Sequence, residues 1–309
     1  MSKPESLMEF KYTESFQAKI ANLHRGKENL PGYESYIRAH LGGPSSRLIR
    51  YINTLIPEIQ YHCGSLKHKQ VLDFGCGTGA TAVALAMYSD STSAFDVDLE
   101  SVHICEHRLR EHGIENQVKL YHANDIDDVK GLMGTFDLIL LNGVIEHIPL
   151  TKTGMRKRLL RTIFTELLNQ SGYMVISETP NRLWPFDFHT TQLWWIPWTR
   201  PGSSWAYTRA VKKGRHVDSP TTSEGSLGLE ERGAWGETYW EIRNYLKDIT
   251  FTCVNLQRGH NRRLHYSYRE TWKEKLFATA MYYSAVKLLH VPICAFTPGI
   301  SNLILKKAA

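Results

Sequence analysis

The chain has 309 residues, of which 42% are hydrophobic and 22% are charged, with a formal net charge of +6 at pH 7. This length is sufficient for one large domain with a substantial appendage. The composition is that of an ordinary globular protein, which excludes disordered and collagen-like chains. The modest positive charge gives only weak support to an anionic partner.

The first residues and the cysteines bear on the compartment of the protein. The opening MSKPESLMEF lacks a positive stub followed by an apolar run, so we expect no secretory signal and a cytoplasmic protein. The five cysteines are odd in number and form no C-x-x-C pair; they are Cys63, Cys76, Cys105, Cys253 and Cys294. We therefore expect reduced thiols, no disulfide framework and no metal site.

Residues 1–69 have the pattern of a helical N-terminal extension. Within them, SSRLIRYINTLI places four aliphatic side chains on one stripe behind a serine cap, namely Leu48, Ile49, Ile52 and Leu55. This segment is predicted to pack as amphipathic helices before the main fold begins.

Residues 70–180 alternate short apolar runs with longer amphipathic segments. Strands are predicted at 70–74, 92–97, 118–123, 136–141 and 173–178, and helices at 80–88, 99–112 and 154–169. This alternation is typical of a parallel sheet covered by helices. Two further strands are predicted at 249–256 and 300–307, flanking a helix at about 270–290. The predicted fold is therefore α/β, a doubly wound and mostly parallel seven-stranded sheet.

Residues 181–245 interrupt this rhythm and are predicted to form an aromatic-rich insertion. Seven of the eight tryptophans of the chain lie between 184 and 240, among several prolines and glycines. A connection of this length is more often a functional lid than filler, although aromatic side chains also fill cores. Residues 246–309 are expected to complete the sheet. Their most apolar stretch, 276–296, is interrupted by Lys287, His290 and Pro292, so we expect no membrane span there, but a buried helix or a homodimer interface.

The stretch VLDFGCGTGATAVALA, residues 71–86, carries the strongest functional signal. Glycines at 75, 77 and 79 permit positive φ and close approach of a ligand, and the helix that follows offers unpaired N–H groups. Two cofactor hypotheses compete. Gly75-x-Gly77-x-x-Ala80 with Asp98 fits a loose dinucleotide pattern, but that pattern requires neither Asp73 nor a third glycine at 79.

The D-x-G-x-G-x-G motif from Asp73 to Gly79 resembles the signature of class I S-adenosylmethionine-dependent methyltransferases. FDVDLESV, YHANDIDD and FDLILLNGVIEHIP resemble the later core segments of that family, in the same order. The pair Glu146-His147 is similar to that of the ubiquinone-biosynthesis group of small-molecule methyltransferases. The resemblance covers residues 70–180 and implies S-adenosylmethionine as the cofactor.

The resemblance also implies a set of cofactor contacts. They are Asp73, Gly75, Gly77, Gly79, Asp98, Asn124, Asp125 and Asn142. Asp73 is expected to cap the turn and to lie near the methionine portion, and Asp98 to bind the ribose hydroxyls. Either Asn124 or Asp125 contacts the adenine, because the chain has Ala-Asn-Asp where the family commonly has Gly-Asp. Asp96 is predicted to face the other side of its strand.

Two histidines are candidates for proton transfer. His147 follows the fourth predicted strand and His189 follows the fifth, and the carboxyl ends of parallel strands are where ligands bind in open α/β sheets. Each is a candidate general base, and for His147 a purely structural role in fixing its loop is an equal alternative. Candidate acceptor-binding residues in the insertion are Trp184, Asp187, Trp194, Trp195 and Arg200, since aromatic faces exclude water and stabilise positive charge.

Together these features predict a methyltransferase acting on a small-molecule acceptor, with O-methylation favoured. The alternative is methylation of a thioether amino acid such as methionine, or of an amine, by proximity and desolvation alone. Nucleic-acid methylation is disfavoured, because Asn142-Gly143-Val144-Ile145 replaces the N/D-P-P-Y/F of enzymes that methylate base amines and no RNA-binding module is recognisable. A cofactor-binding protein without chemistry is a further alternative.

Overall fold

A computed structural model describes residues 10–218, 222–256 and 272–309. Residues 1–9 of the predicted N-terminal extension and 257–271 of the predicted C-terminal part lie outside the described residues. The chain divides into two compact units. Unit 1 comprises residues 1–142 and 166–172, and unit 2 comprises residues 143–165 and 173–309.

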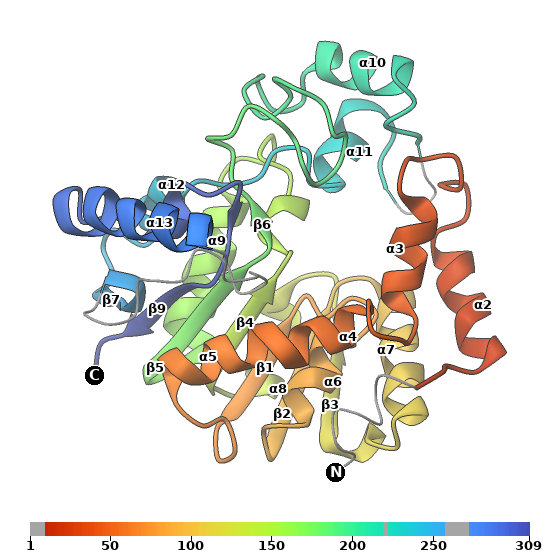
Figure 1. Ribbon diagram of the computed structural model, residues 1–309. Helices are drawn as coiled ribbons and strands as arrows, with labels where there is room; N and C mark the ends of the chain where they lie inside the picture. The colour runs from red at the N-terminus through yellow and green to blue at the C-terminus, as the bar shows by residue number, and fades with distance from the viewer. Residues whose placement is uncertain (1–9, 219–221, 257–271) are drawn as a thin grey trace. The chain divides into compact units, whose positions relative to one another are not determined.

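Unit 1 holds the N-terminal helices and four parallel strands (Figure 1). Its elements are α2 (Glu14–Leu23), α3 (Tyr33–His40), α4 (Arg47–Arg50), η1 (Tyr51–Leu55), α5 (Ile56–Cys63), β1 (Gln70–Phe74), α6 (Ala80–Ala86), β2 (Ser91–Asp96), α7 (Leu99–Glu111), η2 (Glu115–Gln117), β3 (Val118–His122), η3 (Ile126–Asp128), α8 (Lys130–Met133) and β4 (Phe136–Asn142).

Unit 2 holds η4, α9, the rest of the strands and the tryptophan-rich segment. The end of η5 and the start of β5, residues 166–172, belong to unit 1. The elements of unit 2 are η4 (Ile145–His147), α9 (Met155–Thr162), η5 (Ile163–Leu167), β5 (Leu168–Ser177), β6 (Thr179–Pro180), α10 (Ser204–Lys212), α11 (Gly225–Glu231), α12 (Tyr239–Tyr245), β7 (Phe251–Cys253), η6 (Val254–Leu256), α13 (Trp272–Met281), η7 (Tyr282–Leu288), η8 (Ile293–Ala295), β8 (Gly299–Ile300) and β9 (Leu303–Lys307).

The main sheet has seven strands in the order β3-β2-β1-β4-β5-β9-β7. β1 pairs in parallel with β2 and β4, and β2 with β3, whereas β9 runs antiparallel to both β5 and β7. Residues of β1 and β4 are almost all buried, as expected for parallel strands covered on both faces. The predicted seven-stranded, mostly parallel α/β fold is therefore confirmed.

Several predicted boundaries differ from the observed ones, and the start of β5 differs most. The helix predicted at 154–169 is α9 followed by a π-helical turn, and β5 begins at Leu168, five residues before the predicted start of the strand. β5 ends at Ser177 because Glu178 has a positive φ of 56°, which strand backbone does not adopt. The apolar periodicity of the helix runs into the strand without a breaker, so the sequence does not mark this junction.

The N-terminal helices of unit 1 pack on the helices of its core. Tyr12, Phe16 and Ile20 form an apolar cluster with Ile104 of α7, and Thr13 caps α2 by accepting from the Phe16 N–H. The N-terminal extension is thereby joined to α7.

The tryptophan-rich segment of unit 2 has an apolar core of its own. It contains Ile196, Ala206, Ala210, Leu229, Ala234 and Trp235. Trp235 is fully buried, and its indole N–H donates to the Thr199 carbonyl at 3.1 Å. Thr238 and Glu241 form a reciprocal capping box at the start of α12. No helix in the described parts of the chain is long and apolar enough to cross a membrane.

Candidate active site

The glycine loop of unit 1 connects β1 to α6. Gly75, Gly77 and Gly79 all have positive φ, at 76°, 49° and 84°. At Gly79 a Cβ would also lie 2.5 Å from the Cys105 sulfur, so both conformation and space require glycine there. No side chain caps α6. The loop therefore presents backbone at close range to a ligand.

Asp73, at the end of β1, has a buried carboxyl group without a hydrogen bond of normal geometry. Its side chain is 1% exposed, and among the described residues neither oxygen has a hydrogen-bond partner. Burial raises the pKa of Asp73 to about 8; the nearby Asp96 adds to this increase and the Ala82 backbone N–H opposes it. An unpartnered buried carboxyl group costs free energy, and a cationic ligand would remove that cost.

Asp96 and Asp98 lie at the end of β2 and at the start of α7. Asp96, the last residue of β2, accepts from the Gly77 N–H at 2.7 Å and from the Asp98 N–H at 3.0 Å, so its carboxylate holds the glycine loop. Asp98 caps α7 by accepting from the Ser101 N–H and hydroxyl. Burial also raises the pKa of Asp96.

Thr78, inside the glycine loop, is held by residues far away in sequence. Arg108 of α7 donates to the Thr78 carbonyl at 2.6 Å and to the His40 carbonyl at 2.9 Å. The His40 ring nitrogen Nδ1 lies 3.0 Å from the Thr78 hydroxyl. The Arg108 guanidinium also lies over the rings of Tyr12 and Phe16. The N-terminal extension thus braces the loop. The sequence did not predict this role, because the residues in contact are far apart in the chain and no motif links them.

The remaining cofactor candidates of unit 1 follow β3 and β4. Asn124 is exposed. The Asp125 carboxylate accepts from the Asp127 N–H at 3.1 Å and so caps η3. Asn142 donates weakly to the Thr81 hydroxyl at 3.5 Å, and its buried side-chain oxygen has no hydrogen-bond partner among the described residues. Asn142 therefore offers an open acceptor at the end of β4.

In unit 2, three ionisable side chains meet at η4. Glu146 is fully buried and His147 is exposed. The ring nitrogen Nε2 of His189 lies 3.8 Å from the Glu146 carboxylate, and the centroids of the two imidazole rings are 5.4 Å apart. The two histidines that were predicted separately from sequence therefore form one cluster, with a carboxyl group that sequence analysis noted only as His147's neighbour.

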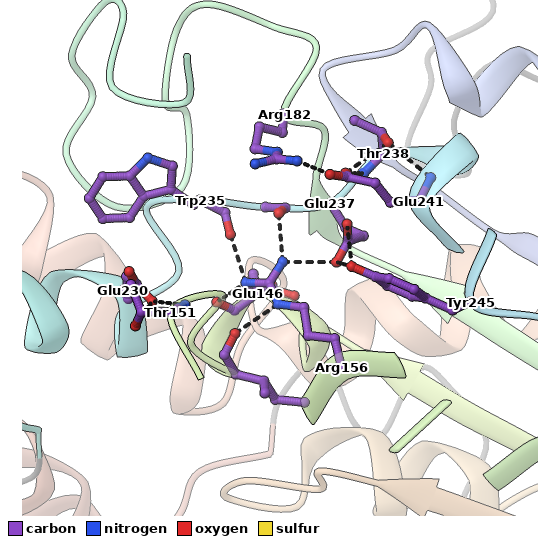
Figure 2. Close-up of polar contacts among 12 residues, drawn as sticks. Glu146, Thr151, Arg156, Arg182, Glu230, Trp235, Glu237, Thr238, Glu241 and Tyr245 are labelled. Carbon is purple, nitrogen blue, oxygen red and sulfur yellow. Dashed lines mark hydrogen bonds and ion pairs between the residues drawn. The ribbon is translucent and has the colours of Figure 1, made fainter. Parts of the chain in front are cut away.

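Arg156 of α9 fixes the position of η4 (Figure 2). Its guanidinium donates to the carbonyls of Ile148 at 2.7 Å and Glu146 at 3.3 Å on one side. On the other side it donates to the Trp235 carbonyl and to the buried carboxylate of Glu237, both at 2.9 Å. Removal of this arginine would leave several buried acceptors without donors.

Asp187 shapes the turn that carries His189. Its buried carboxylate accepts from the N–H groups of His189, Thr190 and Thr191 and from the Thr191 hydroxyl, at 2.7 to 3.0 Å. Burial raises the pKa of Asp187, and these hydrogen bonds oppose that rise. Asp187 therefore orients His189 through the backbone.

The tryptophans divide into two groups. Trp235 belongs to the core described above, whereas Trp184, Trp194, Trp195 and Trp198 are exposed. Ring contacts link Trp194 to Trp195 and Trp195 to Trp198 at centroid distances of 6.1 and 5.3 Å. Arg200 is also exposed. Unit 2 thus combines an aromatic surface with the histidine cluster.

A glycine loop after the first strand, with the buried carboxyl group of Asp73 and the half-buried one of Asp96 beside it, and a seven-stranded sheet that includes antiparallel β9 are typical of a nucleotide-cofactor enzyme of the α/β class. The loop begins at Asp73 and carries three glycines, as in S-adenosylmethionine-dependent methyltransferases. The comparisons with known proteins agree with this class.

The chain belongs to the methyltransferase domain family, whose match spans residues 45–229. The ubiquinone biosynthesis O-methyltransferase of Bordetella avium is 32% identical over 199 residues, which are 64% of this chain and 77% of that protein. The ribosomal protein L11 methyltransferase of Rhodopseudomonas palustris is 32% identical over 114 residues, 35% of this chain and 39% of that protein. The S-adenosylmethionine-dependent methyltransferase structure from Clostridium acetobutylicum is 20% identical with a TM-score of 0.38, covering 48% of this chain and 55% of that one.

The protein is therefore an S-adenosylmethionine-dependent methyltransferase. The residues of unit 1 fit this cofactor, which carries a sulfonium and an ammonium group. The buried, unpartnered Asp73 carboxyl suits a positive charge, and the bare backbone of the glycine loop suits close approach of the ligand.

Proposed function

We propose that the protein transfers a methyl group from S-adenosylmethionine to a hydroxyl oxygen of a small-molecule acceptor. Unit 1 binds the cofactor and unit 2 binds the acceptor. The observation that carries the proposal is the His147–His189 pair beside buried Glu146, in the same unit as the exposed tryptophans. The name of the ubiquinone biosynthesis O-methyltransferase from Bordetella avium adds support for a small-molecule oxygen acceptor.

In the proposed reaction, the acceptor oxygen forms a bond to the methyl carbon while the carbon–sulfur bond breaks in line. The hydroxyl proton passes to the imidazole of His189 or His147, and the cofactor leaves as a neutral thioether. Positioning and exclusion of water supply most of the rate enhancement, and proton removal by a positioned histidine contributes about 10²–10⁴-fold.

Within unit 1, the proposal assigns the methionine portion to Asp73 and the ribose hydroxyls to Asp96 or Asp98. Asn124 or Asp125 contacts the adenine, and Asn142 is a further contact. In unit 2, Trp184, Trp194 and Trp195 enclose the acceptor, with Arg200 at its polar end. Along the chain, residues 181–245 follow a cofactor-binding core at 70–180, precede a C-terminal part at 246–309, and form an acceptor-binding lid. The proposal also includes a cytoplasmic homodimer that does not act on nucleic acid.

A second candidate is methylation of a thioether amino acid such as methionine. It is favoured by one observation: the exposed indole rings of Trp194, Trp195 and Trp198 lie in contact, and aromatic faces stabilise a sulfonium product by cation–π attraction. A thioether acceptor loses no proton, so this reaction needs no histidine.

The test is turnover with S-adenosylmethionine and a pool of phenolic, aliphatic hydroxyl, amine and thioether acceptors, read by mass spectrometry as a gain of one methyl group. We expect an O-methyl product. His189→Ala and His147→Ala should slow its formation by about 10²–10⁴-fold if the histidines accept the proton. A methylsulfonium product that is formed equally well by both variants would replace the leading candidate by the second.

A further inference from the structure

The cluster of Glu146, His147 and His189 contains more ligand groups than proton transfer requires. One ligand atom from each side chain lies within 4.8 Å of the other two. Glu146 contributes a fully buried carboxyl group, and both histidines are accessible. Two imidazoles and one carboxylate are the donor set of many catalytic sites for divalent transition metals.

The hydrogen bonds of the two imidazoles fix their tautomers. His147 Nδ1 lies 2.8 Å from the Glu231 carbonyl, which only accepts, so Nδ1 carries the hydrogen. His189 Nδ1 lies 3.0 Å from the Thr190 hydroxyl, whose single hydrogen is donated to the Arg232 carbonyl at 2.6 Å. His189 Nδ1 must therefore donate as well. In the neutral rings both Nε2 atoms carry a lone pair, and a ring nitrogen oriented by such a hydrogen bond is the usual form of a metal-bound histidine.

The Nε2 atom of His189 lies near a carboxylate. His189 Nε2 lies 3.8 Å from Glu146 Oε1, which is too long for a hydrogen bond. Neither Glu146 oxygen has a hydrogen-bond partner among the described residues. A lone pair opposite a buried carboxylate is unfavourable unless a positive charge lies between them. The separation is close to that of two ligand atoms each about 2.1 Å from a shared metal ion.

The neighbouring backbone holds this arrangement in place. A Cβ on Gly233 would lie 2.9 Å from Glu146 Cγ and 3.0 Å from His189 Cε1. Arg156 anchors the Glu146 carbonyl, and Asp187 anchors the backbone of His189. The backbone of Glu146 and of His189 is therefore fixed, while His147 is exposed.

We propose that Glu146, His147 and His189 bind one divalent transition-metal ion of the zinc type, with an open coordination position. The sequence did not predict this site, because the absence of a C-x-x-C pair indicated no metal and because His189 is distant from Glu146 in the chain. All five cysteines are buried, so thiols do not compete for the ion.

The role of this ion rests on the proposed function, whereas its binding does not. In O-methylation, an acceptor hydroxyl on the open position would have a lowered pKa and release its proton to solvent while the oxygen stays on the ion. With the ion bound, the histidines would act as its ligands, whereas without the ion they remain the proton acceptors of the proposed reaction.

The experiment is a titration of chelator-treated full-length protein with Co²⁺ and Zn²⁺ alone, without cofactor or acceptor. We expect one Co²⁺ per chain with visible absorption bands of a four- or five-coordinate nitrogen–oxygen site, and displacement of Co²⁺ by Zn²⁺. His189→Gln and Glu146→Gln should weaken binding about 100-fold or more. Thr190→Val, which removes the hydroxyl beside His189 Nδ1 together with its hydrogen bond to the Arg232 carbonyl, should weaken it about 10-fold.

His122→Gln is the matched control, because it removes an exposed histidine at the end of β3 and should leave the titration unchanged. Circular dichroism and the melting temperature of each variant show whether it is folded. Absence of a one-to-one complex in the folded wild-type protein, or equal binding by folded Glu146→Gln, would overturn the proposal. Failure to find an acceptor would affect only the proposed function, because the titration contains none.

Discussion

The cofactor loop of unit 1 and the histidine cluster of unit 2 are built in opposite ways. The loop is a contiguous stretch whose backbone conformation does the binding, so glycines at fixed spacing mark it in sequence. The cluster is made of side chains from separate segments, and buried Arg156 and Asp187 keep those segments in place. We expect the backbone site to tolerate loss of a neighbouring side chain, such as one that contacts Thr78, better than the side-chain cluster tolerates loss of Arg156. The following predictions test that difference.

Arg156→Met should have the largest effect on stability. The substitution leaves Glu237 as a buried carboxylate without its cation and removes the donors of several carbonyl groups. We expect the free energy of unfolding to fall by about 3–5 kcal/mol, measured by urea denaturation. Below the unfolding transition, the Kd of S-adenosylmethionine should change by less than about twofold, because no member of the cofactor loop is altered.

The double variant Arg156→Met, Glu237→Gln serves as the control for that prediction. It also removes the buried charge, so part of the lost stability should return. If the double variant is as unstable as the single one, the arginine acts through its carbonyl contacts and not through the ion pair.

Asp73→Asn should separate binding from stability in unit 1. Loss of the carboxylate should weaken S-adenosylmethionine by about 3 kcal/mol, roughly 100-fold in Kd, measured by calorimetry. The same variant should be more stable than the wild type without cofactor at pH 8.5, because it removes a buried, unpartnered charge. A variant that lost both stability and affinity would identify Asp73 as a structural residue.

The pH dependence of cofactor binding follows from the same residue. Burial raises the pKa of Asp73 from 3.8 to about 8, so the folded protein without cofactor holds a proton that the unfolded chain has released between these values. The stability contribution of this group is present below pH 3.8 and is lost as pH rises through 8. A cationic cofactor favours the carboxylate, so binding at pH 6.5 should release a proton, and affinity should rise with pH and level off above pH 8. Calorimetry in buffers of different ionisation enthalpy measures the proton, and Asp73→Asn should abolish its release.

Asp96→Asn and Asp98→Asn form a matched pair with a smaller effect. If the Asp96 carboxylate binds the ribose, Asp96→Asn should weaken the cofactor by about 2 kcal/mol, roughly 30-fold in Kd. Asp98→Asn should cost little, because asparagine also caps a helix. Titration with S-adenosylhomocysteine reads both values. A large effect of Asp98→Asn alone would assign the ribose to Asp98 instead.

Thr78→Val should have the smallest effect and tests the brace on the loop. It removes the hydroxyl that contacts His40 but keeps the carbonyl that accepts from Arg108. We expect an affinity loss of about 1 kcal/mol, roughly fivefold in Kd. Cofactor titration of this variant and of Thr81→Val, whose hydroxyl only meets Asn142 weakly, measures the difference. An unchanged Kd for Thr78→Val would mean that the glycine conformations alone maintain the loop.

The sequence alone determined the sheet, the cofactor class and the place of the glycine loop. Alternating apolar runs fix the parallel strands, and the positive φ values at 75, 77 and 79 are accessible mainly to glycine. Each of these is a local property of the backbone, so a short stretch of residues is sufficient to predict it.

Only the tertiary structure decided which side chains meet. Glu146 and His189, Thr78 and Arg108, and Arg156 and Glu237 are joined across long stretches of chain by packing, which has no periodicity to read. The tertiary structure also decided that Trp235 is buried and that Trp184, Trp194, Trp195 and Trp198 are exposed. Burial depends on every neighbouring element at once, and that is why composition alone does not reveal whether an aromatic residue fills a core or faces a ligand.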